Sequence, residues 1–293
     1  WKARMLEELY VALMHYFEEG DDPSTRVTSI ADEVRRAFGE ASAAEREALE
    51  AFIGQMPERY LLANNVESIV GHARFAIALA DQDVAVRLGP GPGDDVFELV
   101  VTTEDRPGLL ADVAAVLAAN RLSVVGAEVY ARDMPKGPQA FDTFLVRRAG
   151  AGAVPTDIAA RVTHDIRERL ANRVSAKELI SRPPKTPEWA TRQVPDAPTE
   201  VSVDNEVSST CTVVDVFTRD RPGLLSVIAR VFADRKLNIV LSKVNTEGER
   251  VADVFYVQRP DGSKVSEREE VFALRDALRS AVVAFHVEQG AAK

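Results

Sequence analysis

A single cysteine, Cys211, stands among the 293 residues, so no intramolecular disulfide can form. Disulfides are typical of oxidising compartments, and we therefore expect a reducing cytoplasm and a buried, apolar role for Cys211. Long hydrophobic runs are also missing, because no stretch approaches the roughly 18 uninterrupted apolar residues of a membrane-spanning helix. The sequence predicts a cytoplasmic protein that has no membrane partner.

Basic residues are outnumbered. Lys and Arg total 36 against 46 for Asp and Glu, which gives a formal net charge of −10. Domains that bind nucleic acid usually present a basic surface to the phosphate backbone, so this balance argues against a nucleic-acid partner.

Histidine is scarce, and motifs typical of catalysis are missing. The pair His164-Asp165 stands alone in a helical stretch, and Gly89–Gly93 ("GPGPG") lacks the Lys-Ser/Thr and the following helix of a phosphate-binding loop. The spacing of the histidines completes no metal site, and no Ser-His-Asp or Cys-His arrangement is visible. We therefore predict no metal ion and no catalytic residue. The histidines are His15, His72, His164 and His286.

The remaining composition, 46% apolar and 28% charged residues, is ordinary for a globular protein. A chain of 293 residues is long for one compact domain, so two or three units are expected. The chain begins at Trp1 without a basic-then-apolar leader, and we expect it to be the tail of a longer polypeptide.

Residues 1–86 read as a helical segment. In "WKARMLEELYVALMHYF", at the start of the chain, apolar residues recur at steps of three and four. A second helix, "SIADEVRRAFG", is predicted to begin at Ser29 and to end at Gly39, and Ser42 caps a third. Pro57 marks the next break, and "NNVESIVGHARFAIALA" supplies a fourth helix.

Beyond a turn-rich linker, Arg87–Asp95, the string "DRPGLL" occurs twice, at Asp105–Leu110 and Asp220–Leu225, 115 positions apart (220 − 105). Each copy follows a β-rich run and opens a helix whose apolar face has spacings of one, four, seven and eight. The third strands match at a shift of 111, so the first copy carries about four extra residues near "DMPKGP". The matching helix residues are Leu109, Leu110, Val113, Val116 and Leu117 against Leu224, Leu225, Ile228, Val231 and Phe232.

The economical interpretation is two β-α-β-β-α units, each closed by one more strand, with Glu200–Asp204 ("EVSVD") closing the first. We predict an α+β fold in which helices cover one face of each sheet. The predicted parts are a helical segment at 1–86, a ferredoxin-like βαββαβ domain at 95–206 and a second one at 207–293.

The repeated motif has the chemistry of a helix start. Proline suits the first helical position, where its missing N–H would be unsatisfied in any case. Asp105 and Asp220 can cap the free amides, and Gly108 and Gly223 remove a side chain where a ligand could approach the backbone. Helix-start N–H groups suit a carboxylate and a neighbouring Asp suits an ammonium, so the turn offers complementary parts for a free amino acid. The simpler alternative is a strand-to-helix turn without a ligand.

The motif is followed by "LSVVGAEV" or "LNIVLSKV" and then by "FDTFLV" or "ADVFYV", and in this order the segments resemble the ACT domain, a small regulatory module that binds amino acids. The paired copies and the helical segment before them resemble the C-terminal part of the bifunctional PII uridylyltransferase/uridylyl-removing enzymes. This resemblance covers nearly the whole chain and is strongest over Val194–Val257.

The resemblance implies a sensor. In that family a nucleotidyltransferase domain adds UMP to the PII signalling protein, a metal-dependent hydrolase domain removes it, and the ACT pair senses glutamine. UTP and Mg²⁺ belong to the catalytic domains, whose sequence motifs this chain lacks. We therefore expect no enzymatic activity and no cofactor here, glutamine as the ligand, and PII as a partner reached through the parent enzyme.

The resemblance also implies where the ligand binds, because ACT domains bind where the strand-to-helix turn of one unit meets the second strand of another. Asn238 offers both donor and acceptor groups, which would suit the glutamine amide, whereas Ser123 is shorter, so the two sites could differ. The apolar members of the set could equally be core, and the two arginines surface charge. The predicted ligand-binding residues are Asp105, Arg106, Gly108, Leu109, Leu110, Ser123 and Val124 from the first copy, and Asp220, Arg221, Gly223, Leu224, Leu225, Asn238 and Ile239 from the second.

Two other functions stay open on the sequence alone. In one, the ACT pair only forms a homodimer through the open sheet edges of its ferredoxin-like units. In the other, the chain is itself a transferase or a hydrolase. Asp142 and Asp253 on the third strands would be its carboxylate pair, but we interpret them as edge or interface groups.

Overall fold

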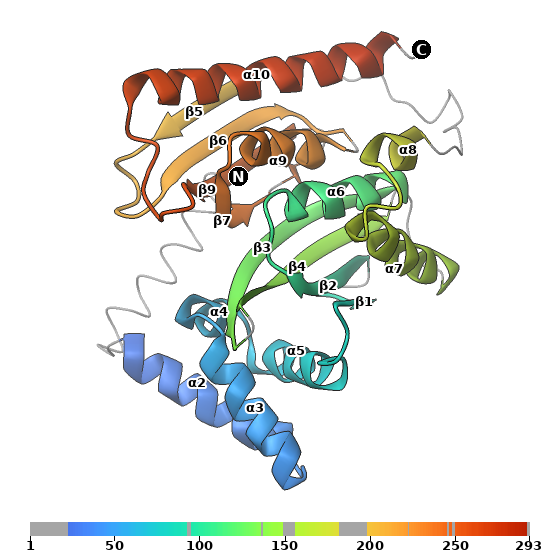
Figure 1. The fold of residues 1–293 in the computed structure, drawn as a ribbon, viewed down its shortest axis with the longest axis vertical. Helices are drawn as coiled ribbons and strands as arrows, with labels where there is room; N and C mark the ends of the chain where they lie inside the picture. Colours follow the sequence, from blue (N-terminus) through green and yellow to red (C-terminus); the bar gives the residue numbers. More distant parts are fainter. Residues whose placement is uncertain are drawn as a thin grey trace. The chain divides into compact units, whose positions relative to one another are not determined.

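The computed structural model describes residues 23–92, 95–135, 137–148, 156–181, 198–221, 223–244, 246–247 and 250–291 (Figure 1). The first predicted helix and most of the Pro-rich connection before Glu200 lie outside these residues. The chain divides into two compact units. One contains the helices up to Gln82 together with Ala131–Pro138, and the other contains Asp83–Tyr130 and the chain from Gln139 onward.

In its described part, the first unit consists mainly of helices. The predicted end of the second helix at Gly39 is confirmed by a φ of 77°. Ser42 forms a capping box, in which its hydroxyl accepts from the Glu45 N–H at 3.2 Å and the Glu45 carboxylate accepts from the Ser42 N–H at 2.8 Å. The predicted start at Ser29 is wrong, because the helix already begins at Pro23. The helices are α2 (Pro23–Phe38), α3 (Ala43–Gln55), α4 (Glu58–Ala63) and α5 (Val66–Ala78).

The segment Ala131–Pro138, which is the tip of a long hairpin, belongs to the first unit. The first repeat carries its extra residues at this tip. The buried Arg132 anchors this tip. Its Nη2 donates to Oε1 of Gln55 at 2.7 Å, and its guanidinium lies 5.0 Å from the centroid of the Phe52 ring. The hairpin strands are β3 (Leu122–Met134) and β4 (Gly137–Arg148).

Replacing Arg132 by Ala is expected to destabilise the helical unit by about 2 kcal/mol, because a buried hydrogen bond and a cation–π contact are lost together. Urea unfolding, combined with amide hydrogen exchange in α3, measures the effect. Asp133→Ala, at the exposed neighbouring position, is the matched control. Equal destabilisation by the two variants would contradict the role assigned to Arg132.

The second unit contains two antiparallel sheets, the first with strand order β1–β2–β4–β3. Its edge strand β1 (Val84–Pro90) pairs with β2 (Val96–Glu104), from Val84 opposite Thr103 to Pro90 opposite Phe97. The sequence predicts the end of the helical segment and a linker here, which is wrong. Proline and glycine are compatible with this strand because it lies at the edge of the sheet, where one row of backbone groups needs no partner.

The second sheet has the order β5–β6–β9–β7, and the short β8 pairs with β9. Strand β5 pairs antiparallel with β6, beginning at Glu200 opposite Phe217. The prediction that Glu200–Asp204 closes the first domain is therefore wrong. The strands are β5 (Glu200–Asp204), β6 (Thr212–Arg219), β7 (Asn238–Lys243), β8 (Thr246–Glu247) and β9 (Arg250–Gln258).

In both domains an additional strand comes before the strand that leads into the repeated turn, and it pairs with that strand. It occupies the sheet edge that the predicted closing strand would have occupied. The element order is thus ββαββα in place of the predicted βαββαβ, and the antiparallel ladder is completed either way. The predicted α+β class with two ferredoxin-like domains is confirmed. The first domain begins at Val84 and the second at Glu200.

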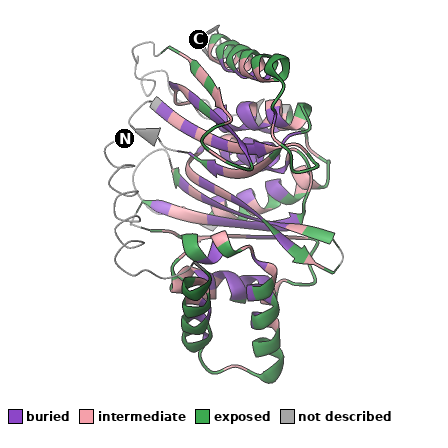
Figure 2. Cartoon of the chain, turned by 90° about the vertical axis from the view of Figure 1, so that its left-hand side faces the viewer, coloured by how far each residue is buried: buried purple, intermediate pink, exposed green. Residues whose placement is uncertain are grey.

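Helices α6 and α9 pack against each other and join both domains in one hydrophobic core (Figures 1 and 2). Across this contact the Ser226 hydroxyl donates to the carbonyl oxygen of Ala111 at 2.9 Å. The predicted apolar faces are buried except for Val231, which is half-buried, and Cys211 is buried as predicted. The helices of this unit are α6 (Leu109–Ala119), α7 (Thr156–Leu170), α8 (Ala176–Ser181), α9 (Leu224–Asp234) and α10 (Arg268–Ala291).

Candidate functional site

Both repeated motifs form a tight turn, but the proline and the acid do not start the helix. Helix α6 begins at Leu109 and α9 at Leu224, and their N-caps are Gly108 and Gly223, with φ of 85° and 96° and no side-chain capping bond. This left-handed backbone is what the glycines supply, since other residues adopt it at a cost. The predicted helix start at the proline and the predicted capping by Asp105 and Asp220 are therefore wrong, and Pro222 lies outside the described residues.

The acid of each motif is instead held at the end of the preceding strand. Burial raises the pKa of the Asp220 carboxyl, and a hydrogen bond from the backbone of Arg221 opposes this effect. Burial likewise raises the pKa of Asp105, and a hydrogen bond from the backbone of Arg106 opposes this effect. Asp220 is half-buried and Asp105 is more exposed. A half-buried carboxylate such as Asp220 gains most from a cationic partner, because little solvent competes for it.

A small pocket of about 30 Å³ lies where the second turn meets the first domain, which leaves room for a few water molecules. Seven of the predicted site residues line it. Leu224 and Leu225 contribute to the core as well. The first domain contributes Ala114, Ala118, Leu122, Ser123 and Val124, and the second contributes Asp220, Arg221, Gly223, Leu224, Leu225, Val244, Val251 and Asp253.

The other predicted residues do not line this pocket. Leu109 and Leu110 are buried in the core. Arg106 is bound to Asp112 at 2.8 Å, and Asn238, which we expected to bind the glutamine amide, is exposed at the start of β7. Ile239, on the same strand, packs partly against the core.

One polar lining residue was missed by the sequence reasoning. Asp253 is 2% exposed and lies on β9, between β6 and β7, so of the two predicted positions, edge or interface, the edge is wrong. Its counterpart Asp142 is likewise buried on β4, between β2 and β3. The recurrence of an acid at equivalent third-strand positions was the signal available in the sequence. The other lining residues not predicted are Ala114, Ala118, Leu122, Val244 and Val251.

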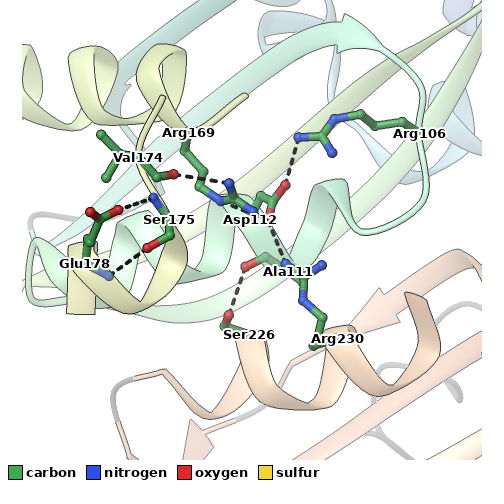
Figure 3. Close-up of polar contacts among 9 residues, drawn as sticks. All are labelled: Arg106, Ala111, Asp112, Arg169, Val174, Ser175, Glu178, Ser226 and Arg230. Atoms are coloured by element: carbon green, nitrogen blue, oxygen red, sulfur yellow. Dashed lines mark hydrogen bonds and ion pairs between the residues drawn. The ribbon is translucent and has the colours of Figure 1, made fainter. Parts of the chain in front are cut away.

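Near the first turn, three arginines converge on one carboxylate (Figure 3). Asp112 is 1% exposed and accepts from Arg106 at 2.8 Å, from Arg169 at 2.8 Å and from Arg230 at 2.7 Å. Arg230 comes from the second domain, so this cluster ties the two domains together. The sequence did not indicate it.

Among the residues that the structure describes, no group of three or more His, Cys, Asp or Glu side chains is arranged to hold a metal ion. None of the described helices is both long enough and apolar enough to cross a membrane.

Two family models match the second unit. The one described as "ACT domain" matches residues 97–161, and the one described as "ACR9-like, ACT-like domain" matches residues 200–287. These ranges fall on the two α+β domains. The second unit thus contains two domains in tandem, one matching the ACT model and one matching the ACT-like model.

The whole chain is homologous to enzymes named bifunctional uridylyltransferase/uridylyl-removing enzyme, which confirms the predicted resemblance. The enzyme of Rhodospirillum rubrum is 31% identical over 301 residues, covering 99% of this chain and 31% of the relative. Those of Caulobacter vibrioides and Phenylobacterium zucineum are 30% and 31% identical, covering 96% and 100% of this chain and 30% and 31% of the relatives. The chain thus spans about a third of the length of these relatives.

Among solved structures, a crystal structure of aspartate kinase from Synechocystis covers 57% of this chain and 25% of its own, with a TM-score of 0.30 and 12% identity. At that score the match supports no conclusion.

Proposed function

We propose that the chain is the glutamine-sensing region of a PII uridylyltransferase/uridylyl-removing enzyme, in which an amino acid bound between the two ACT domains sets the balance between uridylylation and deuridylylation of PII. The observation that carries the proposal is the pocket at the domain junction, lined by an acid, an arginine and a helix start. The relatives' printed activities and the tandem ACT pair support a regulatory role for this region.

The lining suits a ligand with both charges. Asp220 and Asp253 are carboxylates facing a small pocket, and an ammonium group can bind between them through charge-assisted hydrogen bonds. Arg221 supplies the complement for a carboxylate.

The size of the pocket links binding to a change of domain arrangement. Its volume of about 30 Å³ admits water-sized groups, and we infer that the walls contributed by the two domains move apart when glutamine enters. A ligand shifts an equilibrium only by its difference in affinity for two states. The more open arrangement is the state that glutamine stabilises, and the catalytic domains of such an enzyme would respond to that arrangement.

Titration calorimetry of the chain with glutamine, glutamate and serine tests the proposal. We expect heat with glutamine at concentrations up to a few millimolar and weaker or no heat with the other two. No heat with glutamine over this range would contradict the proposal. Sedimentation in the same solutions tests the alternative, since a concentration-dependent dimer unaffected by any amino acid would favour a pure assembly module.

A further inference from the structure

The two turns are related by an approximate twofold symmetry. An ideal Cβ on Gly223 would lie 3.8 Å from Cβ of Ala118, and one on Gly108 would lie 3.4 Å from Cβ of Ala233. Ala118 and Ala233 are themselves 115 positions apart, as the two glycines are. Each turn therefore faces the equivalent alanine on the helix of the other domain. We call each turn, together with the facing end of that helix, a cradle, and the sequence repeat predicts two equivalent cradles.

The cradle at Gly108, formed by the first turn and the facing end of α9, differs from its counterpart by one cation. Nη1 of Arg230 lies 3.2 Å from the ideal Cβ position of Gly108. Nη2 of the same guanidinium donates to Asp112 at 2.7 Å. At Gly223 the nearest groups are the ring carbons of Phe285, at 3.6 Å, and the methyl of Ala118.

The sequence explains why the two sides differ. The positions equivalent to Arg230 and Asp112 are Ala115 and Val227, at a shift of 115 in each direction. Neither charge has a counterpart in the other domain, so nothing at the Gly223 side can form this ion pair. The repeat makes the two turns alike, but it fails at positions 112 and 230. The ion pair between these two residues holds a guanidinium beside the Gly108 turn.

We propose that Arg230 fills the cradle at Gly108, so that the chain binds a single amino acid, at Gly223, and that the residue at position 230 sets this number. The inference rests on the proposed function and adds its stoichiometry. A ligand at Gly108 would have to displace this guanidinium, which lies 3.2 Å from the ideal Cβ position of Gly108 and is bound to Asp112 at 2.7 Å.

Calorimetric titration with glutamine tests the number of sites on the full chain. We expect one site per chain for the wild type, two for Arg230→Ala, and one for Arg279→Ala, which removes an exposed arginine on α10. Two sites in the wild type would overturn the inference, and so would a single site in Arg230→Ala. No binding to the wild type would instead count against the proposed function.

A second measurement, which needs no glutamine, tests whether Arg230 fills the cradle at Gly108. Methylguanidinium carries the head group of the missing side chain, and at millimolar concentration it should raise the Tm of Arg230→Ala by about 2 °C through binding to the vacated position. Wild type and Arg279→Ala should show no such rise. An Arg230→Ala protein whose Tm methylguanidinium leaves unchanged would overturn the inference, whatever the outcome with glutamine.

Discussion

Asp220→Asn is expected to lower the affinity of the chain for glutamine by about 100-fold. The variant keeps the shape of the side chain and removes the charge that holds the ligand's ammonium group in a half-buried pocket. Truncating one partner of a buried, hydrogen-bonded charge pair costs about 2–5 kcal/mol, and each 1.4 kcal/mol is tenfold in affinity. Titration calorimetry at pH 7 measures the loss.

Asp105→Asn is the matched control, because it makes the same change at the equivalent position of the first turn. If the cradle at Gly108 is filled by Arg230, the affinity for glutamine should remain within about twofold of the wild type. A loss of affinity in Asp105→Asn as large as that in Asp220→Asn would show that the two turns are used alike, against the asymmetry inferred from Arg230.

The same Asp220→Asn variant should not be less stable than the wild type in the absence of ligand. Burial raises the pKa of Asp220, so its folded-state pKa lies above the unfolded value of about 3.9. Protonation then favours the fold: the wild type gains stability as the pH falls through the folded-state pKa, and the gain is complete below the unfolded pKa. Melting curves should show the largest advantage of Asp220→Asn at pH 7 and a smaller one near pH 4.

Asp112→Ala should destabilise the ACT pair by about 3 kcal/mol and lower its Tm by roughly 10 °C. The buried carboxylate neutralises three guanidiniums from both domains, and its loss leaves them converging on one another without a counter-charge. The arginines are 35%, 15% and 41% exposed, so solvent screens part of their repulsion and the expected cost stays at the lower end for a broken buried pair. Thermal and urea unfolding followed by circular dichroism measure the effect.

Arg106→Ala distinguishes the contribution of the Asp112 carboxylate to stability from that of one of its arginine partners. Arg106 is partly solvated, and Asp112 keeps two other arginines when it is removed, so we expect a loss below about 1 kcal/mol. If Asp112→Ala were no more destabilising than Arg106→Ala, Asp112 would not be the centre of the cluster.

The repeated helices were predictable because their signal is local. Leu109 and Leu110 recur as Leu224 and Leu225 with the same helical spacing, and both pairs are buried as the spacing requires. Strand β1 was not predictable, because "RLGPGP" carries the glycines and prolines of a linker. It becomes a strand through its pairing with β2, the next strand along the chain, beside which it forms the edge of the sheet.

The lining of the pocket was predictable in part. The resemblance to ACT domains indicated the turn that contains Asp220 and Gly223 and the second strand near Ser123, and residues from both line the pocket. It could not reveal which of two equivalent turns is open, because that depends on contacts such as the one between Arg230 and Asp112, which are 118 positions apart. Asn238, the preferred partner for an amide, proved exposed, since the strand that lines the pocket is the one carrying Ser123.

A crystal structure of the chain grown with saturating glutamine tests the account most directly. We predict one glutamine per chain, between the domains, with its amino nitrogen about 3 Å from a carboxylate oxygen of Asp220 and with Arg230 still bound to Asp112. Glutamine bound at the Gly108 turn, or at a place remote from both turns, would contradict it.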